Sequence, residues 1–226
     1  MIKTVETMGL SYVEMITGNT VKATIVWLHG LGADGHDFAN LVPQLNLPPD
    51  FGIHFIFPHA PIRPITINQG MPMRGWYDIT SLTRLEDDVP GILESCNAVE
   101  HLLQQQIQSG VSPNQIILAG FSQGGAIALH TALNFKEKIG GVLALSTYLP
   151  ATQQLLSGNI QKELSIFLAH GTHDDVIPLF LAESAKNWLI AKGFMVDWHA
   201  YPMAHQVCMP EIEDIKNWLI STLLTH

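Results

Sequence analysis

One short segment constrains the fold of this chain more than any other: the pentapeptide Gly-Phe-Ser-Gln-Gly at positions 120–124. An apolar run at 116–119 precedes it, and a stretch rich in helix-forming residues at 125–133 follows it. This order predicts a strand, a sharp turn and a helix, with Ser122 at the apex of the turn. Glycine is needed two residues to either side of the serine, because side chains there would collide with neighbouring backbone. An ordinary glycine-rich turn is the alternative interpretation.

Strand and helix patterns alternate along the whole chain. Several apolar runs are continuous, including 25–28, 116–118, 142–145 and 166–168, which is typical of strands that are covered on both faces. We therefore expect an α/β fold with a mostly parallel sheet and helices on both faces. The expected strands are residues 10–16, 24–29, 53–58, 115–120, 141–145, 165–170 and 195–200, and the expected helices are residues 37–45, 85–109, 124–133, 179–192 and 212–224.

The composition excludes several classes of protein. Hydrophobic residues make up 47% of the 226 residues and charged residues 14%, so the chain is not disordered. The net charge is −9 and no basic cluster is visible, which argues against nucleic acid as a partner. No apolar stretch approaches the roughly 20 residues that a membrane span needs, so we expect no stable membrane insertion. The length favours one domain over residues 1–226.

The N-terminus and the cysteines indicate a cytoplasmic location. The first residues include a glutamate at position 6 and lack the apolar core of a secretory signal. Cys96 and Cys208 are the two cysteines. They could form one bridge, but nothing in their number or spacing indicates a disulfide framework, so we expect two reduced thiols.

Residues with chemical functions follow the expected strands. Ligands bind outside the carboxyl ends of the strands in a parallel sheet. Ser122 follows one strand, an acidic segment at 174–175 follows a later strand, and His205 follows the next. This is the chain order of a Ser-Asp-His triad. Histidine can take the proton of the serine hydroxyl, and an acid can orient the histidine. The chemistry alone leaves both Asp174 and Asp175 open as the acid.

A triad also needs donors for the oxyanion of the tetrahedral intermediate. The backbone N–H after the serine belongs to Gln123, and a second donor is expected in the loop after an early strand, near Leu31. Gly30 and Gly32 would let that loop approach the substrate closely.

The chain resembles the carboxylesterase and acyl-protein thioesterase family of α/β-hydrolases over nearly its whole length. The shared segments are Leu-His-Gly-Leu-Gly-Ala-Asp-Gly at 28–35, Trp-Tyr-Asp at 76–78, Gly-Phe-Ser-Gln-Gly-Gly at 120–125, His-Gly-Thr-His-Asp-Asp-Val-Ile-Pro at 170–178, and the region of His205. The resemblance implies an α/β-hydrolase fold, and the length leaves little room for a separate cap domain.

The same resemblance assigns roles to individual residues. It implies Ser122 as the nucleophile, Asp174 as the acid and His205 as the base, with Leu31 and Gln123 as oxyanion-hole donors. The family usually has a glycine before the catalytic histidine, where this chain has alanine at position 204. It implies no metal and no cofactor. The eleven histidines form no His-x-x-x-His pair and no Cys/His cluster with zinc spacing.

The longest irregular stretch, about residues 58–82, is expected to be functional because long loops in compact domains usually are. Met71, Met73 and Trp76 lie in it. Flexible methionines suit an adaptable wall for an acyl chain, so these three residues are candidate substrate-binding residues. The alternative is that they only cover the edge of the sheet.

Together these observations predict a serine carboxylesterase that hydrolyses short-to-medium acyl esters or thioesters through an acyl-enzyme intermediate. The substrate would be a small molecule or an acylated carrier, and exposed apolar residues could support a homodimer. The alternatives are a protein-acyl thioesterase or lysophospholipase acting on long chains, a peptidase or true lipase, and a non-catalytic binding protein on the same scaffold.

Overall fold

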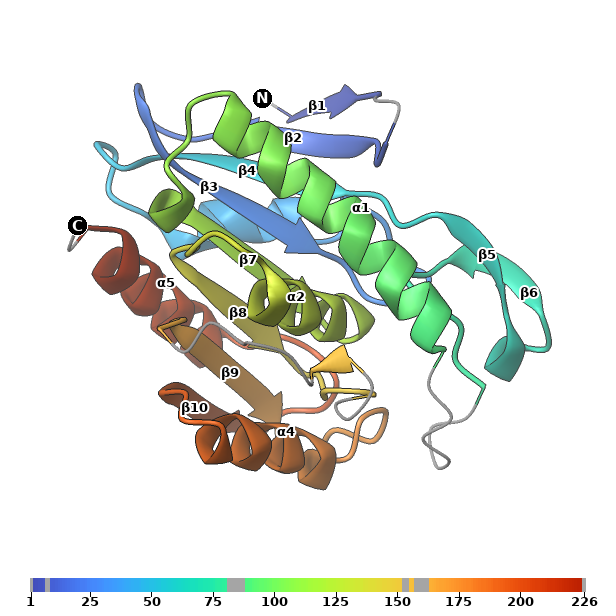
Figure 1. Cartoon of the computed structure of the whole chain (residues 1–226). Helices are drawn as coiled ribbons and strands as arrows, with labels where there is room; N and C mark the ends of the chain where they lie inside the picture. The colour runs from blue at the N-terminus through green and yellow to red at the C-terminus, as the bar shows by residue number, and fades with distance from the viewer. Residues whose placement is uncertain (1, 7–8, 81–87, 152–154, 157–162, 225–226) are drawn as a thin grey trace.

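A twisted central sheet organises the computed structural model, which describes residues 2–6, 9–80, 88–151, 155–156 and 163–224 (Figure 1). Its eight strands are ordered β1-β2-β4-β3-β7-β8-β9-β10. The six strands β4-β3-β7-β8-β9-β10 pair parallel with one another, whereas β2 pairs antiparallel with both β1 and β4. The mostly parallel sheet predicted from the sequence is therefore confirmed.

The elements alternate along the chain as expected. The strands are β1 (Ile2–Val5), β2 (Tyr12–Ile16), β3 (Val21–Leu28), β4 (Gly52–Pro58), β5 (Ile62–Ile65), β6 (Met71–Arg74), β7 (Ile116–Phe121), β8 (Gly141–Leu145), β9 (Ile166–Gly171) and β10 (Val196–Tyr201). The α-helices are α1 (Val89–Gln108), α2 (Gln123–Asn134), α4 (Leu179–Ala191) and α5 (Met209–Leu224), and the 3₁₀-helices are η1 (Ala39–Leu45), η2 (Thr66–Asn68) and η3 (Pro113–Gln115).

Helices cover both faces of the sheet (Figure 1). In β7, Ile116 and Leu118 belong to a core shared with α1, α2 and α4, whereas Ile117 and Ala119 belong to a core shared with η1 and α5. Successive side chains of a strand point to opposite faces. A strand that is buried on both faces therefore needs apolar residues at every position, which explains the continuous apolar run in the sequence.

Four parts of the chain differ from the sequence expectation. β1 was not expected, and the stretch expected to be irregular contains a hairpin, β5–β6. In that hairpin Pro64 faces Pro72, and proline conceals strand signals because it is tolerated only at sheet edges and bulges. The expected helix at 37–45 is the 3₁₀-helix η1, which contains Pro43. The expected helix at 85–109 begins at Val89, and residues 85–87 lie outside the described residues.

The two cores should dominate stability. Replacing the fully buried Leu118 with alanine should lower the free energy of unfolding by about 2–5 kcal/mol, because it removes apolar contacts and leaves a cavity. Leu93→Ala, at a position on α1 that is 47% exposed, is the matched control and should change it by well under half of that amount. Urea unfolding of both variants would test the comparison, and equal losses would contradict it.

Candidate active site

Ser122 lies in the turn between β7 and α2, in a backbone conformation that residues with side chains rarely adopt (φ 54°, ψ −123°). The turn leaves almost no space around it. A Cβ atom on Gly124 would lie 2.5 Å from the carbonyl oxygen of His29, and one on Gly120 would lie 2.3 Å from the carbonyl oxygen of Gly124. These are the collisions that the sequence pattern predicts, so only glycine fits on either side of the serine.

The structure brings Ser122, His205 and Asp174 together. The Oγ atom of Ser122 lies 2.9 Å from Nε2 of His205, and Nδ1 of His205 lies 2.7 Å from Oδ2 of Asp174. The other carboxylate oxygen of Asp174 accepts hydrogen bonds from the backbone N–H groups of Val176 and Ile177, at 2.9 and 2.8 Å. This arrangement places one ring nitrogen of His205 where it could take the serine proton, and the other against the carboxylate.

The geometry separates the two candidate acids. Asp174 is buried and contacts His205, whereas Asp175 is exposed. His170, which is also buried, holds the Asp174 loop from inside: its Nε2–H donates to the carbonyl of Ile177 at 2.8 Å and lies 3.5 Å from Oδ2 of Asp174. Burial is the main cause that lowers the pKa of His170, which favours its neutral form.

Two loops meet to bring the acid and the histidine together. The N–H of Thr172 donates to the carbonyl of Tyr201 at 2.8 Å, and the N–H of His173 donates to the carbonyl of Met203 at 3.0 Å. A Cβ atom on Gly171 would lie 2.5 Å from the carbonyl oxygen of Ala204. The loops after β9 and β10 are thus joined by backbone contacts. Ala204, where the family usually has glycine, is exposed.

A column of aromatic rings supports His205 from one side. The ring of Phe121 lies 4.8 Å from the His205 ring, Phe38 lies 5.5 Å from Phe121, and Trp27 is stacked on Phe38 at 5.2 Å. Phe121 was not singled out from the sequence, although it occupies the variable position directly before Ser122. The two rings are tilted by 48°, so Phe121 packs against one side of the imidazole.

Leu31 and Gln123 lie at the same cavity as Ser122. Within the described part of the chain, neither backbone N–H of these two residues has an acceptor. The Leu31 loop is held open by Gly32, which has a positive φ of 78° and donates its N–H to the carbonyl of Arg74 at 2.8 Å. Two unpaired N–H groups beside a serine hydroxyl can stabilise an oxyanion.

His29 fixes the start of the Leu31 loop. Its Nε2 accepts the N–H of Ala60 at 3.0 Å, so its Nδ1 carries the proton and donates to the carbonyl of Gly30 at 2.7 Å. Burial lowers the pKa of His29 to about 4. The ring is therefore neutral at neutral pH, as this pair of hydrogen bonds requires.

A cavity of about 220 Å³ opens beside Ser122. Apolar groups make up most of its wall, and the serine and the two candidate oxyanion residues lie along it. The lining residues are Leu31, Ile67, Asn68, Tyr77, Ile79, Ser122, Gln123, Tyr148, Val176 and Ile177. An apolar pocket with a few converging polar groups is typical of a small-ligand site.

The three candidate substrate-binding residues do not line this cavity. Met71 is 61% exposed on β6, and the sulfur of Met73 accepts a hydrogen bond from the side chain of Asn68. Trp76 is fully buried beneath the site. The same stretch reaches the cavity through Ile67 and Asn68 instead. Sequence reasoning missed these residues because it did not predict the β5–β6 hairpin that carries η2 at its turn.

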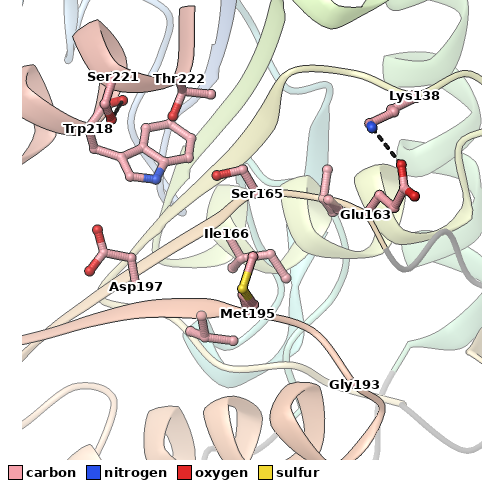
Figure 2. A pocket seen from close by; sticks show the side chains of 12 residues that line it. Lys138, Glu163, Ser165, Ile166, Gly193, Met195, Asp197, Trp218, Ser221 and Thr222 are labelled. Carbon is pink, nitrogen blue, oxygen red and sulfur yellow. Dashed lines mark hydrogen bonds and ion pairs between the residues drawn. The ribbon is translucent and has the colours of Figure 1, made fainter. Parts of the chain in front are cut away.

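A larger hollow, of about 730 Å³, lies at the amino-terminal ends of β9 and β10 (Figure 2). Trp218 and Met195 line it, and Lys138 forms an ion pair with Glu163 at 2.6 Å beside it. This hollow is at the end of the sheet opposite to Ser122. Sites in parallel sheets lie at the carboxyl ends of the strands, so the smaller cavity is the better candidate.

Among the described residues we also searched for metal ligands, activated thiols and membrane-spanning helices. No cluster of three or more histidine, cysteine or acidic residues there could hold a metal ion. Both Cys96 and Cys208 are free thiols, and burial raises the pKa of Cys96 to about 12. None of the described helices combines the length and hydropathy needed to cross a membrane.

The family model described as Phospholipase/Carboxylesterase matches residues 13–223. The chain belongs to this family. Members of the phospholipase/carboxylesterase family are serine hydrolases that act on esters and thioesters, so this chain is a hydrolase of that kind with an α/β-hydrolase fold.

Relatives of this phospholipase/carboxylesterase family member include two fungal proteins named acyl-protein thioesterase 1. The protein from Cryptococcus neoformans is 36% identical over 223 residues, covering 89% of this chain and 92% of the relative. The protein from Yarrowia lipolytica is 38% identical over 205 residues, covering 87% of this chain and 90% of the relative.

Solved structures show the same fold. Arabidopsis thaliana SOBER1 matches with a TM-score of 0.84 at 29% identity, covering 89% of this chain and 99% of the other. Zea mays acyl-protein thioesterase 2 matches with a TM-score of 0.81 at 28% identity, covering 93% of this chain and 98% of the other.

Buried histidines should make this family member less stable in acid. Burial lowers the pKa of both His29 and His130 from 6.5 to about 4. The unfolded chain therefore binds protons below pH 6.5 that the folded chain does not bind until about pH 4. The free energy of unfolding thus decreases as the pH is lowered from 6.5 to about 4. His130→Gln, which can keep the hydrogen bond to the carbonyl of Pro150, should flatten the dependence by about 1.4 kcal/mol per pH unit. Urea unfolding between pH 4 and 7 tests this prediction. Plots of the free energy of unfolding against pH that run parallel for the wild type and His130→Gln would contradict it.

Proposed function

We propose that this protein hydrolyses short-to-medium acyl esters or thioesters through an acyl-enzyme intermediate, with Ser122 as the nucleophile, His205 as the base and Asp174 as the acid. The observation that carries the proposal is the continuous chain of hydrogen bonds from Ser122 through His205 to Asp174 at the edge of an apolar cavity. The backbone N–H groups of Leu31 and Gln123, which have no acceptor among the described residues, lie at the same cavity and support it.

Each residue has a defined task in the proposed reaction. The Oγ atom of Ser122 attacks the carbonyl carbon while Nε2 of His205 takes the serine proton. The negative charge that forms on the carbonyl oxygen is stabilised by the N–H groups of Leu31 and Gln123. His205 then gives its proton to the departing alcohol or thiol, which leaves an ester on Ser122. A water molecule, deprotonated by His205, then attacks the carbonyl carbon of this ester. His205 returns the proton to Ser122 as the bond to the serine breaks and the acid is released.

The cavity supports the proposed chain length. About 220 Å³ corresponds to roughly seven water molecules at about 30 Å³ each. This space suits a short or medium acyl chain better than a palmitoyl chain. Tyr77 and Tyr148 narrow the cavity, and their hydroxyl groups are hydrogen-bonded to each other at 3.3 Å.

A second candidate function is hydrolysis of thioesters on acylated proteins. Two fungal relatives are named acyl-protein thioesterases. Val176, which lines the cavity, is also 43% exposed, so a chain attached to a larger carrier could enter from the surface. Hydrolysis of a thioester needs the same nucleophile, Ser122, and the same base, His205, as hydrolysis of an ester. This candidate function therefore shares the proposed acyl-enzyme mechanism.

The assignment of the acid can be tested by a matched pair of variants. Asp174→Asn should lower kcat about 10⁴-fold, because the histidine loses the partner that fixes its tautomer. Asp175→Asn, one residue away and exposed, should leave kcat nearly unchanged. Ser122→Ala should abolish the acyl-enzyme route and lower kcat about 10⁶-fold. Steady-state hydrolysis of a p-nitrophenyl ester measures all three, and equal losses at the two aspartates would contradict the assignment.

The chain length can be tested by a second pair. Ile67→Ala should enlarge the cavity and move the optimum of kcat/KM toward longer acyl chains, whereas Ile62→Ala on the same hairpin, 67% exposed and outside the cavity, should not move it. The measurement is kcat/KM for p-nitrophenyl esters from acetyl to palmitoyl. A wild-type rate that rises to palmitoyl would refute the proposed chain length and favour the second candidate.

A further inference from the structure

The two candidate oxyanion donors come from separate parts of the fold. Leu31 lies in the loop after β3, and Gln123 is the first residue of α2. An oxyanion hole accelerates a reaction only when its donors are held in place before charge develops. Something must therefore fix the distance between these two loops, and residues 74–77, which we name the brace, contact both of them.

The brace makes two hydrogen bonds to the first loop. The carbonyl of Arg74 accepts the N–H of Gly32 at 2.8 Å. The indole N–H of Trp76 donates to the carbonyl of His29 at 2.9 Å. These bonds lie on either side of Leu31 in the chain, so they fix the peptide that carries the donor.

Two more hydrogen bonds join the brace to the second loop through the side chain of Gln123. Its Oε1 accepts the backbone N–H of Trp76 at 2.7 Å, and its Nε2 donates to the carbonyl of Tyr77 at 2.7 Å. Trp76, Tyr77 and Gln123 are no more than 2% exposed. Because water cannot replace buried partners, these bonds are costly to break.

Packing leaves the brace little freedom to move. A Cβ atom on Gly75 would lie 3.1 Å from Cδ1 of Leu31 and 3.6 Å from Oε1 of Gln123, so this glycine lies between the two oxyanion residues. The carbonyl of Trp76 accepts a hydrogen bond from the hydroxyl of Ser95 on α1. Both the main chain and the side chain of Trp76 are thus anchored.

We propose that the brace sets the separation of the two oxyanion donors, and that Trp76 and the side chain of Gln123 are positioning residues for the oxyanion hole. The inference rests on the proposed function, since it concerns the same reaction. The brace also contains Tyr77, which lines the cavity. One segment therefore holds both the place for the acyl chain and the place for the carbonyl oxygen.

Two variants with matched controls test the inference. Gln123→Met keeps the backbone N–H and most of the side-chain volume but loses both bonds to the brace. Trp76→Phe keeps an aromatic ring but loses the bond to His29. The controls are Gln106→Met near the end of α1 and Trp218→Phe in α5, which are buried residues of the same types far from Ser122.

The measurements are kcat and KM for a short-chain ester, and the inhibition constant of a trifluoromethyl ketone with the same chain, which forms a tetrahedral adduct on the serine. Displaced donors should lower kcat and weaken the ketone together by about 10- to 100-fold, with KM little changed. Both controls should behave like the wild type. Melting temperatures of all four variants ensure that each assay is run on folded protein.

Three results would decide against the brace. Variants that match their controls would show that the donors are held by other contacts. A rise in KM alone would show that the segment serves substrate binding. If Gln123→Met does not fold, Gln123→Glu keeps the acceptor for Trp76 and loses the donor to Tyr77, and an unchanged response to the ketone would overturn the proposal. Failure of the proposed function is separate, because it would appear as a wild type without Ser122-dependent hydrolysis.

Discussion

The close approach of α2 to the strands beside it is the constraint on which the site depends. Gly124 packs against the carbonyl of His29, and a Cβ atom on Gly125 would lie 2.8 Å from the side chain of Thr147 after β8. No other residue type would let the helix begin so close to β3 and β8. This contact raises Ser122 out of the sheet and places the first N–H of the helix next to the Leu31 loop.

Backbone groups do most of the positioning around that serine. Two N–H groups hold Asp174, and backbone contacts between the loops after β9 and β10 carry His205 to it. The hydroxyl of Thr147 donates to the carbonyl of Ser122 at 2.7 Å, which fixes the turn from below. Backbone groups belong to the fold itself, so a site held in this way is ordered before any substrate arrives.

Some of this could be predicted from the sequence because it rests on local steric rules. The glycines around Ser122 and the apolar runs of the inner strands follow from backbone geometry and burial, and the structure has both as the sequence predicts. The family resemblance supplied what spacing could not, the choice of Asp174 over Asp175. The structure adds a physical reason, because only Asp174 is buried against His205.

Other features could not be predicted because they depend on contacts between distant segments. The sequence marks Trp76 as notable but does not reveal that its indole faces His29 and its N–H faces Gln123. Tyr148 and Ile79 carry no local signal for a cavity wall, and they meet only when β8 and the hairpin are both in place. The prolines of β5 and β6 concealed the hairpin that decides which residues of its stretch reach the cavity.

The order of strands in the sheet also bears on how the molecule folds. Ser122 and His205 are 83 residues apart in the sequence, and β3 pairs with β7 across all of β4, the hairpin and α1. Such non-local pairing raises the contact order and is intrinsically slow to form. A chain that emerges from synthesis therefore has no assembled site until β10, its last strand, has joined β9. Ser122, Asp174 and His205 therefore lie together only in the completed sheet, so the candidate site belongs to the whole fold and to no single part of it.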